Sequence, residues 1–180
     1  ENHPIDPTDS VYLTTKRFGE ILCEMFYNKY ALPTLYFRLF NTFGERQGPE
    51  YIIPTIILQA INKGYVDLWS DKPVRDFTYV KDTVDAFVKG AQTKFCGGPI
   101  NIGSGKEISI GELTGKIVDT LRQFDVNAEI RFLNKEVIGP MRLLCDNTKA
   151  QRLLSWQPKT PLDVGIKNTA GWYVENKSIS

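Results

Sequence analysis

At 180 residues, the chain is long enough to bury one hydrophobic core, or one domain with part of another. Its 42% hydrophobic and 24% charged residues are ordinary for a soluble globular protein, and a net charge of +1 gives no electrostatic basis for binding nucleic acid. Since no apolar run approaches the roughly 20 residues that a membrane span requires, we expect neither a nucleic-acid nor a membrane partner.

Helices are predicted where apolar residues recur at helical spacing between recognisable start and stop residues. The first follows a cap at Asp9 or Ser10 and ends before Pro33, and the second carries an early proline and stops at Gly64. Ser109 is expected to cap a later helix. The remaining helical segments are 82–93, 111–124, 147–154 and 162–176.

Strands are predicted from short β-rich runs that alternate with these helices. Residues 34–40 read as a buried strand, and residues 41–50 read as the loop that follows it. Shorter strands are expected at 66–69, 76–80, 99–103 and 128–132. Because strands and helices alternate, the fold class is α/β or α+β.

The cysteines, Cys23, Cys96 and Cys145, are odd in number, widely spaced and set among apolar residues. We therefore expect reduced core thiols in a cytoplasmic protein. Their spacing does not resemble that of metal ligands, so no metal site is expected. The single histidine, His3, lies in a polar segment and is expected at the surface.

Tyr12 and Lys16 are four residues apart on the first predicted helix, so their side chains share one face. A lysine ammonium beside a phenol favours the phenolate, and such a tyrosine can act as a general base or acid. The alternative is an ordinary exposed pair on a solvated helix. So short a pattern does not decide between these two interpretations.

Five longer segments do favour the first interpretation, because they occur together and in a familiar order. Taken together they resemble the C-terminal half of the NAD-dependent epimerase/dehydratase family of extended short-chain dehydrogenases/reductases, specifically its nucleotide-sugar epimerases and 4,6-dehydratases. The segments are H-P-I-D-P-T-D-S-V-Y-L-T-T-K, L-F-N-T-F-G-E-R-Q-G-P, V-R-D-F-T-Y-V-K-D, N-I-G-S-G-K-E-I-S-I-G-E-L and D-N-T-K-A-Q-R-L-L-S-W-Q-P-K-T.

The resemblance implies an α/β fold: the C-terminal part of a Rossmann-type doubly wound sheet plus a small mixed α/β substrate-binding lobe. It divides the chain into 1–45, the last helix–strand unit of an NAD-binding domain, and 46–180, the substrate lobe. The cofactor would be NAD, with most of its site in an N-terminal half missing upstream, because no Gly-x-x-Gly-x-x-Gly is present. The Gly103–Gly105 run is expected to close a loop.

By the same resemblance, Tyr12 and Lys16 are the catalytic residues and also contact the nicotinamide end of NAD. Tyr12 would take the proton of the sugar 4-hydroxyl. Lys16 would support the phenolate and hydrogen-bond the nicotinamide ribose. The 4-keto sugar formed in this way permits either epimerisation or loss of water.

The substrate implied is a nucleoside diphosphate sugar. Asn41 and Arg75 correspond to the diphosphate-binding residues of the family, and a guanidinium can bind a diphosphate through two hydrogen bonds. The alternatives are that Asn41 caps a loop and that Arg75 forms a salt bridge with Asp76 or Asp82.

Three further substrate contacts are expected on the same basis. Glu50 resembles a sugar- or phosphate-proximal residue of some 4,6-dehydratases, although an exposed glutamate would look the same. Phe77 is expected to pack near the nucleotide, or alternatively in the core. Asn101 is expected to face the base.

One departure from the family pattern concerns an Arg-Pro-Gly-Asp motif that contacts the nucleotide. In the corresponding stretch Val137 and Pro140 replace both polar residues, and Arg142 is a candidate substitute.

We therefore interpret the chain as a fragment of an NAD-dependent nucleotide-sugar epimerase or 4,6-dehydratase, inactive alone and homodimeric through its first helix. The alternative is a non-catalytic module that binds a sugar nucleotide or a protein.

Overall fold

The computed structural model describes residues 11–136 and 139–176, and it confirms the α/β class. The helices are α1 (Val11–Tyr30), α2 (Ile52–Lys63), α3 (Val80–Gln92), α4 (Ile110–Arg122), α5 (Thr148–Leu154) and α6 (Leu162–Glu175). The strands are β1 (Tyr36–Leu39), β2 (Asn41–Phe43), β3 (Tyr65–Leu68), β4 (Val74–Arg75), β5 (Phe77–Tyr79), β6 (Pro99–Ile102), β7 (Ile108–Ser109), β8 (Glu129–Phe132) and β9 (Arg142–Leu143).

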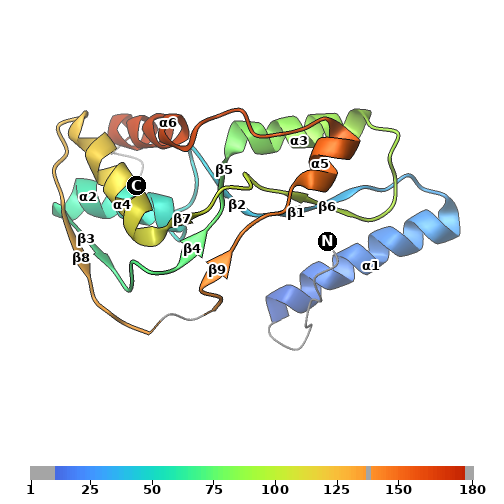
Figure 1. The fold of residues 1–180 in the computed structure, drawn as a ribbon, viewed down its shortest axis with the longest axis horizontal. Helices are drawn as coiled ribbons and strands as arrows, with labels where there is room; N and C mark the ends of the chain where they lie inside the picture. The colour runs from blue at the N-terminus through green and yellow to red at the C-terminus, as the bar shows by residue number, and fades with distance from the viewer. Residues whose placement is uncertain (1–10, 137–138, 177–180) are drawn as a thin grey trace.

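The strands pair mostly in parallel, and each parallel pair joins segments that are far apart in the sequence (Figure 1). β1 pairs with β6, β2 with β5, and β3 with β8. β4 lies between antiparallel β7 and parallel β9. Such parallel pairs need long crossover connections, which the intervening helices provide.

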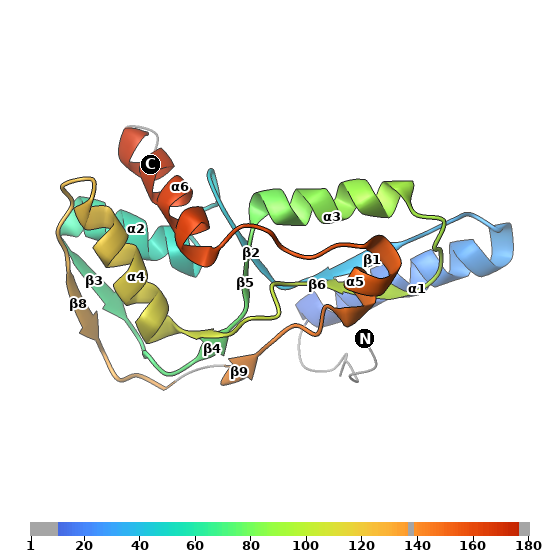
Figure 2. The ribbon, with the colours of Figure 1, turned by 45° about the horizontal axis from the view of Figure 1, so that its top comes forward.

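The buried apolar residues form two clusters within the described residues. The larger cluster joins β2, β3 and β5 to α2, α4 and α6, and the smaller one joins β6 to α3 and α5. In Figure 2, α3 and α5 lie over β1 and β6, whereas α2, α4 and α6 gather at the other end of the molecule. Because Leu35 and Phe37 pack on the smaller cluster, that cluster draws on residues before and after position 45. The domain boundary at residue 45 stays a prediction.

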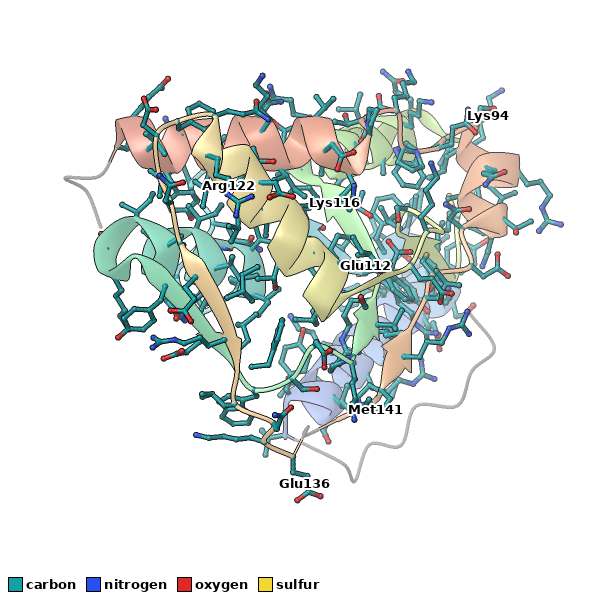
Figure 3. All side chains as sticks on the ribbon, turned by 60° about the vertical axis from the view of Figure 1, so that its left-hand side comes forward. Lys94, Glu112, Lys116, Arg122, Glu136 and Met141 are labelled. Carbon is teal, nitrogen blue, oxygen red and sulfur yellow. The ribbon has the colours of Figure 1, made fainter. Side chains whose placement is uncertain are left out.

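Ser109 explains where α4 begins, and Gly64 explains where α2 ends. Ser109 Oγ accepts a hydrogen bond from the Glu112 backbone N–H, and the Glu112 carboxylate reaches back to Ser109, which completes a capping box. Figure 3 shows Glu112 at the start of α4. Gly64 closes α2 at φ 70°, a left-handed conformation that glycine adopts at little cost. Both sequence predictions are confirmed.

Other predictions need correction. Residues 41–43 were expected in a loop, but they form β2, because Asn41 to Phe43 pair in register with Phe77 to Tyr79. Residues 34–40 were expected as a buried strand, yet β1 is only half-buried and Leu39 is 47% exposed. The third helix begins at Val80, two residues before the predicted start.

The cysteines are free, but only Cys145 is buried, whereas Cys23 and Cys96 are partly exposed. The expectation of three core thiols was therefore wrong for two of them. The predicted cap at Asp9 or Ser10 and the predicted position of His3 lie outside the described residues. Along the described part of the chain, no helix is both long and apolar enough to span a membrane.

Candidate active site

The first helix presents Tyr12 and Lys16 to solvent near its start. The Lys16 Nζ lies 5.3 Å from the centroid of the Tyr12 ring, and Tyr12 is 66% exposed. The predicted i,i+4 pairing on one helix face is therefore present. A phenol and an ammonium in this arrangement are accessible to a ligand and can move a proton.

A cleft of about 1130 Å³ lies between α2, β2, β4 and the start of α1. Five of the predicted site residues line it together: Tyr12, Asn41, Glu50, Arg75 and Phe77. Its volume exceeds the roughly 300–1,000 Å³ typical of small-molecule sites, which leaves room for an elongated ligand. Lys16 and Asn101 are not among the lining residues.

Arg75 is half-buried on β4 at the side of this cleft. Its Nη1 donates to the backbone oxygen of Val74 at 2.9 Å and more weakly to that of Met141 at 3.4 Å. Burial lowers the pKa of the guanidinium from its ordinary value, although an arginine remains charged at neutral pH. Within the described residues, no carboxylate lies within salt-bridge distance of Arg75.

The expected alternative, a salt bridge from Arg75 to a nearby aspartate, is not what the structure shows. Asp82 accepts hydrogen bonds from the backbone N–H groups of Lys159 and Thr160, both at 3.0 Å. Asp76 is occupied in a similar way by other segments. The positive charge of Arg75 is therefore available to an anionic ligand in the cleft.

Asn41 and Phe77 face each other across the β2–β5 pair. The Asn41 Nδ2 donates to the backbone oxygen of Asp76 at 2.9 Å, which leaves the second N–H and the amide oxygen for a ligand. Phe77 is 7% exposed and packs edge-on against Phe43, with ring centroids 6.4 Å apart. Phe77 thus belongs to the core and also forms part of the cleft wall.

Glu50 is exposed in the loop before α2 and lines the cleft beside Gly48 and Gln47. This loop is attached to the last helix, because the Tyr173 hydroxyl donates to the backbone oxygen of Gln47. The Gln47 Nε2 in turn donates to the backbone oxygen of Thr42 at 2.7 Å. The sequence did not predict this attachment.

Asn101 lies away from the cleft, on β6. It is 9% exposed, and its Nδ2 approaches the backbone oxygen of Asp146 at 3.4 Å. The neighbouring Asn147 donates to the backbone oxygen of Gly103 at 2.9 Å, and Lys149 donates to that of Pro99. The Asp-Asn-Thr-Lys segment therefore joins α5 to β6 and to the loop that follows.

The residue that sequence reasoning missed is Asp76, whose side chain is fully buried. Its carboxylate accepts hydrogen bonds from the backbone N–H groups of Ser104 and Gly105, both at 2.8 Å, and of Cys145 at 3.2 Å. The Ser104 hydroxyl donates to it as well, at 2.6 Å. Asp76 therefore joins three segments directly beside Arg75, and its place in the Arg-Asp-Phe motif was the one indication of this in the sequence.

The Gly103–Gly105 run closes the loop between β6 and β7, as expected. A Cβ added at Gly103 would lie 2.6 Å from the Cys145 sulfur, so this close approach requires glycine. Arg142, the candidate replacement for the missing Arg-Pro-Gly-Asp motif, is exposed and pairs with Glu107 at 2.6 Å. The neighbouring Leu143 lines the cleft, Pro140 is exposed, and Val137 lies outside the described residues.

A comparison with protein families resolves which family this arrangement belongs to. Residues 1–169 match the family model described as GDP-mannose 4,6 dehydratase. The chain belongs to that family. The resemblance to the C-terminal half of NAD-dependent epimerases and dehydratases is confirmed at this level.

Members of the GDP-mannose 4,6-dehydratase family and their relatives resemble the chain over nearly its whole length. It is 29% identical to human dTDP-D-glucose 4,6-dehydratase, a match that covers 98% of this chain and 51% of that protein. It is 32% identical to UDP-glucose 4-epimerase of Mycolicibacterium smegmatis, a match that covers 99% of this chain and 56% of that protein. A solved structure of DesIV, a dTDP-glucose 4,6-dehydratase from Streptomyces venezuelae, has NAD bound. It superimposes on this chain with a TM-score of 0.87 at 25% identity, and the match covers 99% of this chain and 55% of DesIV. The chain thus spans about half the length of the relatives it matches.

Proposed function

We propose that the chain provides the catalytic helix and the substrate-binding part of an NAD-dependent nucleotide-sugar epimerase or 4,6-dehydratase that acts through a 4-keto sugar. One observation carries the proposal: Tyr12, the proposed base, lines the same cleft as Asn41, Glu50 and Arg75. A proton-transfer group and a diphosphate-binding cation therefore lie in one cavity large enough for a nucleoside diphosphate sugar.

In this proposal Tyr12 removes the proton from the 4-hydroxyl of the sugar as the C4–H bond breaks. The Lys16 ammonium, 5.3 Å from the ring centroid, stabilises the negative charge of the phenolate. After oxidation the 4-keto group acidifies the neighbouring position, which permits elimination of water. Return of the hydride to the other face gives the epimer instead.

The described residues fit one end of NAD. Tyr12 and Lys16 are exposed, carry donor groups, and would hold the nicotinamide ribose beside the cleft. The cofactor, when bound, supplies the acceptor for the hydride of C4. The 180 residues contain no Gly-x-x-Gly-x-x-Gly for the pyrophosphate, so we propose that most of the NAD site lies elsewhere and that the chain alone is inactive.

The substrate side of the cleft supports a diphosphate. Arg75 is the half-buried cation that lines it, and Asn41 offers an amide next to it. Phe77 and Leu143 provide apolar wall for the rest of the ligand. Asn101 keeps its predicted role as a proposal only, because the structure places it outside the lining of this cleft.

Arg75→Ala tests the proposal. We expect the affinity for a UDP- or dTDP-sugar to fall about 10- to 150-fold, since a charge-assisted hydrogen bond is worth roughly 1.5–3 kcal/mol. Calorimetric titration of the sugar nucleotide into the wild-type chain and the variant measures the change. Arg122→Ala is the matched control, because Arg122 is an exposed arginine of α4 outside the cleft lining and this variant should bind normally.

Equal binding by wild type and Arg75→Ala would contradict the proposed substrate site. Binding that depends on Arg75, without turnover when the cofactor-binding half is supplied, would instead favour a non-catalytic sugar-nucleotide module.

We also propose that the protein is a homodimer that associates through α1. The helix has no buried residue, and large apolar side chains along it are exposed, including Phe18 at 60%, Ile21 at 47% and Met25 at 42%. Exposed apolar surface of this kind favours association. Light scattering should therefore show a concentration-dependent dimer, and Phe18→Ser with Met25→Ser should shift it toward monomer. A wild-type chain that stays monomeric at all concentrations would contradict this.

Two further proposals concern location and domain organisation. The free cysteines agree with a reducing compartment, and we propose a cytoplasmic location. We also propose that residues 1–45 belong with an NAD-binding domain and residues 46–180 with the substrate lobe.

A further inference from the structure

We propose that Glu20 and Arg38 are positioning residues: their ion pair fixes the catalytic helix on β1 and thereby places Tyr12 in the cleft. The proposal rests on the proposed function for the role of Tyr12. The attachment itself can be tested without catalysis.

The ion pair between Glu20 and Arg38 is bidentate. The Arg38 Nε donates to Glu20 Oε1 at 2.7 Å and its Nη2 donates to Oε2 at 2.8 Å, so the guanidinium binds both carboxylate oxygens. Arg17 donates to the same Oε2 at 2.8 Å. The Glu20 side chain is only 11% exposed and that of Arg38 23%, which protects the pair from solvent screening.

Other polar contacts also attach α1 to the β1 segment. No residue of α1 belongs to either buried apolar cluster, and its side chains are at most partly buried. Further hydrogen bonds between α1 and the β1 segment run from the Tyr36 hydroxyl to Glu24, at 2.7 Å, and from the Thr34 hydroxyl to the backbone oxygen of Cys23, at 3.1 Å. The hydrogen bonds from Arg38 lower the pKa of the Glu20 carboxyl below its ordinary value, so the pair stays charged at neutral pH.

The sequence spacing relates the Glu20–Arg38 ion pair to Tyr12 and Lys16. Tyr12, Lys16, Glu20 and Glu24 follow one another at intervals of four, so they form one stripe along α1. The end of the stripe that carries Glu20 and Glu24 is fixed to β1, and the end that carries Tyr12 reaches the cleft. On the other side, Arg38 lies three residues before Asn41, which also lines the cleft.

The length of the helix makes this placement sensitive. Eight residues separate Glu20 from Tyr12, or about 12 Å at a rise of 1.5 Å per residue. A tilt of about 5° at Glu20 would therefore move the phenol by about 1 Å, and a misplacement of that size can lower a rate roughly 100-fold.

Hydrogen exchange of the chain, followed by mass spectrometry, tests the attachment. Most of the stability of a helix in a protein comes from its packing on other elements, so weaker docking should expose its amides. In Arg38→Met we expect the amides of α1 to exchange about tenfold faster or more, and in Arg38→Lys, which keeps the charge and loses the fork, by less. The amides of β3, α4 and β8 should be unchanged.

The matched control is Arg122→Met. Arg122 also pairs with a carboxylate, Asp119 at 2.6 Å, but on the exposed surface of α4 (Figure 3). It should leave exchange in α1 unchanged. Unaltered α1 exchange in Arg38→Met would overturn the proposal, and so would faster exchange throughout the chain, which would make Arg38 a general stabilising residue.

A kinetic measurement on the full-length enzyme completes the test. Arg38→Met should lower kcat with little change in KM, Arg38→Lys should recover part of kcat, and Arg122→Met should match wild type. If the wild-type protein turns over no nucleotide sugar while α1 exchange still depends on Arg38, the proposed function fails and the attachment stands. If turnover is present but kcat is insensitive to Arg38, the positioning role is overturned.

Discussion

Tyr12→Phe is expected to reduce turnover of a nucleotide sugar by at least roughly 100-fold, because it removes the single oxygen proposed to carry the proton. The phenyl ring remains, so the wall of the cleft keeps its shape and the affinity for the sugar nucleotide should change little. Product formation and nucleotide-sugar binding, measured separately on the chain supplied with the proposed cofactor-binding half, would show this separation.

Two further variants test whether the loss of turnover is specific to the Tyr12 hydroxyl. Tyr30→Phe removes an equivalent hydroxyl from the other end of α1, where Tyr30 is 59% exposed and is not among the cleft residues, and it should leave turnover unchanged. Arg75→Ala should show the opposite pattern, with weaker binding. A Tyr12→Phe variant that retained most of its activity would remove Tyr12 from the role of general base.

Asp76→Ala is expected to lower the free energy of unfolding by about 3 kcal/mol, because it leaves three backbone N–H groups without the buried carboxylate that accepts their hydrogen bonds. These are the N–H groups of Ser104, Gly105 and Cys145. Asp76→Asn keeps one acceptor oxygen but turns an NH₂ toward the other donors, so its loss of stability should be intermediate. Urea denaturation followed by circular dichroism measures both values.

Asp119→Ala is the control, since Asp119 is an exposed carboxylate in a surface pair and should leave the unfolding midpoint where it is. A midpoint for Asp76→Ala equal to that of Asp119→Ala would mean that the Asp76 hydrogen bonds contribute nothing to stability.

The elements with strong local determinants were predictable from the sequence. The capping box at Ser109 and the terminating Gly64 act within a few residues, so they predicted the start of α4 and the end of α2. The two-residue strands β4, β7 and β9 were missed, because two residues are too few to show an alternating pattern. They exist through pairing with one another.

In the candidate site, too, the local sequence predicted some features, and contacts between distant segments determined the others. The motif led to Arg75, but the reason that Arg75 has no carboxylate partner among the described residues lies in contacts from distant segments to Asp76 and Asp82. The spacing of Tyr12 and Lys16 predicted that they share a helix face. Only the fold shows that Tyr12 and Asn41 line the same cleft and that Asn101 is not among its lining residues.

The parallel pairing of distant strands also constrains the order in which the chain can fold. β1 is synthesised before its partner β6, which begins at Pro99, and β3 is synthesised before its partner β8, which begins at Glu129. Native contacts of such long sequence separation carry a large loop-closure cost and are typical of slow-folding proteins. During translation, β1 and β3 therefore lack their partner strands until β6 and β8 have been made, and unpaired strand edges of this kind favour aggregation.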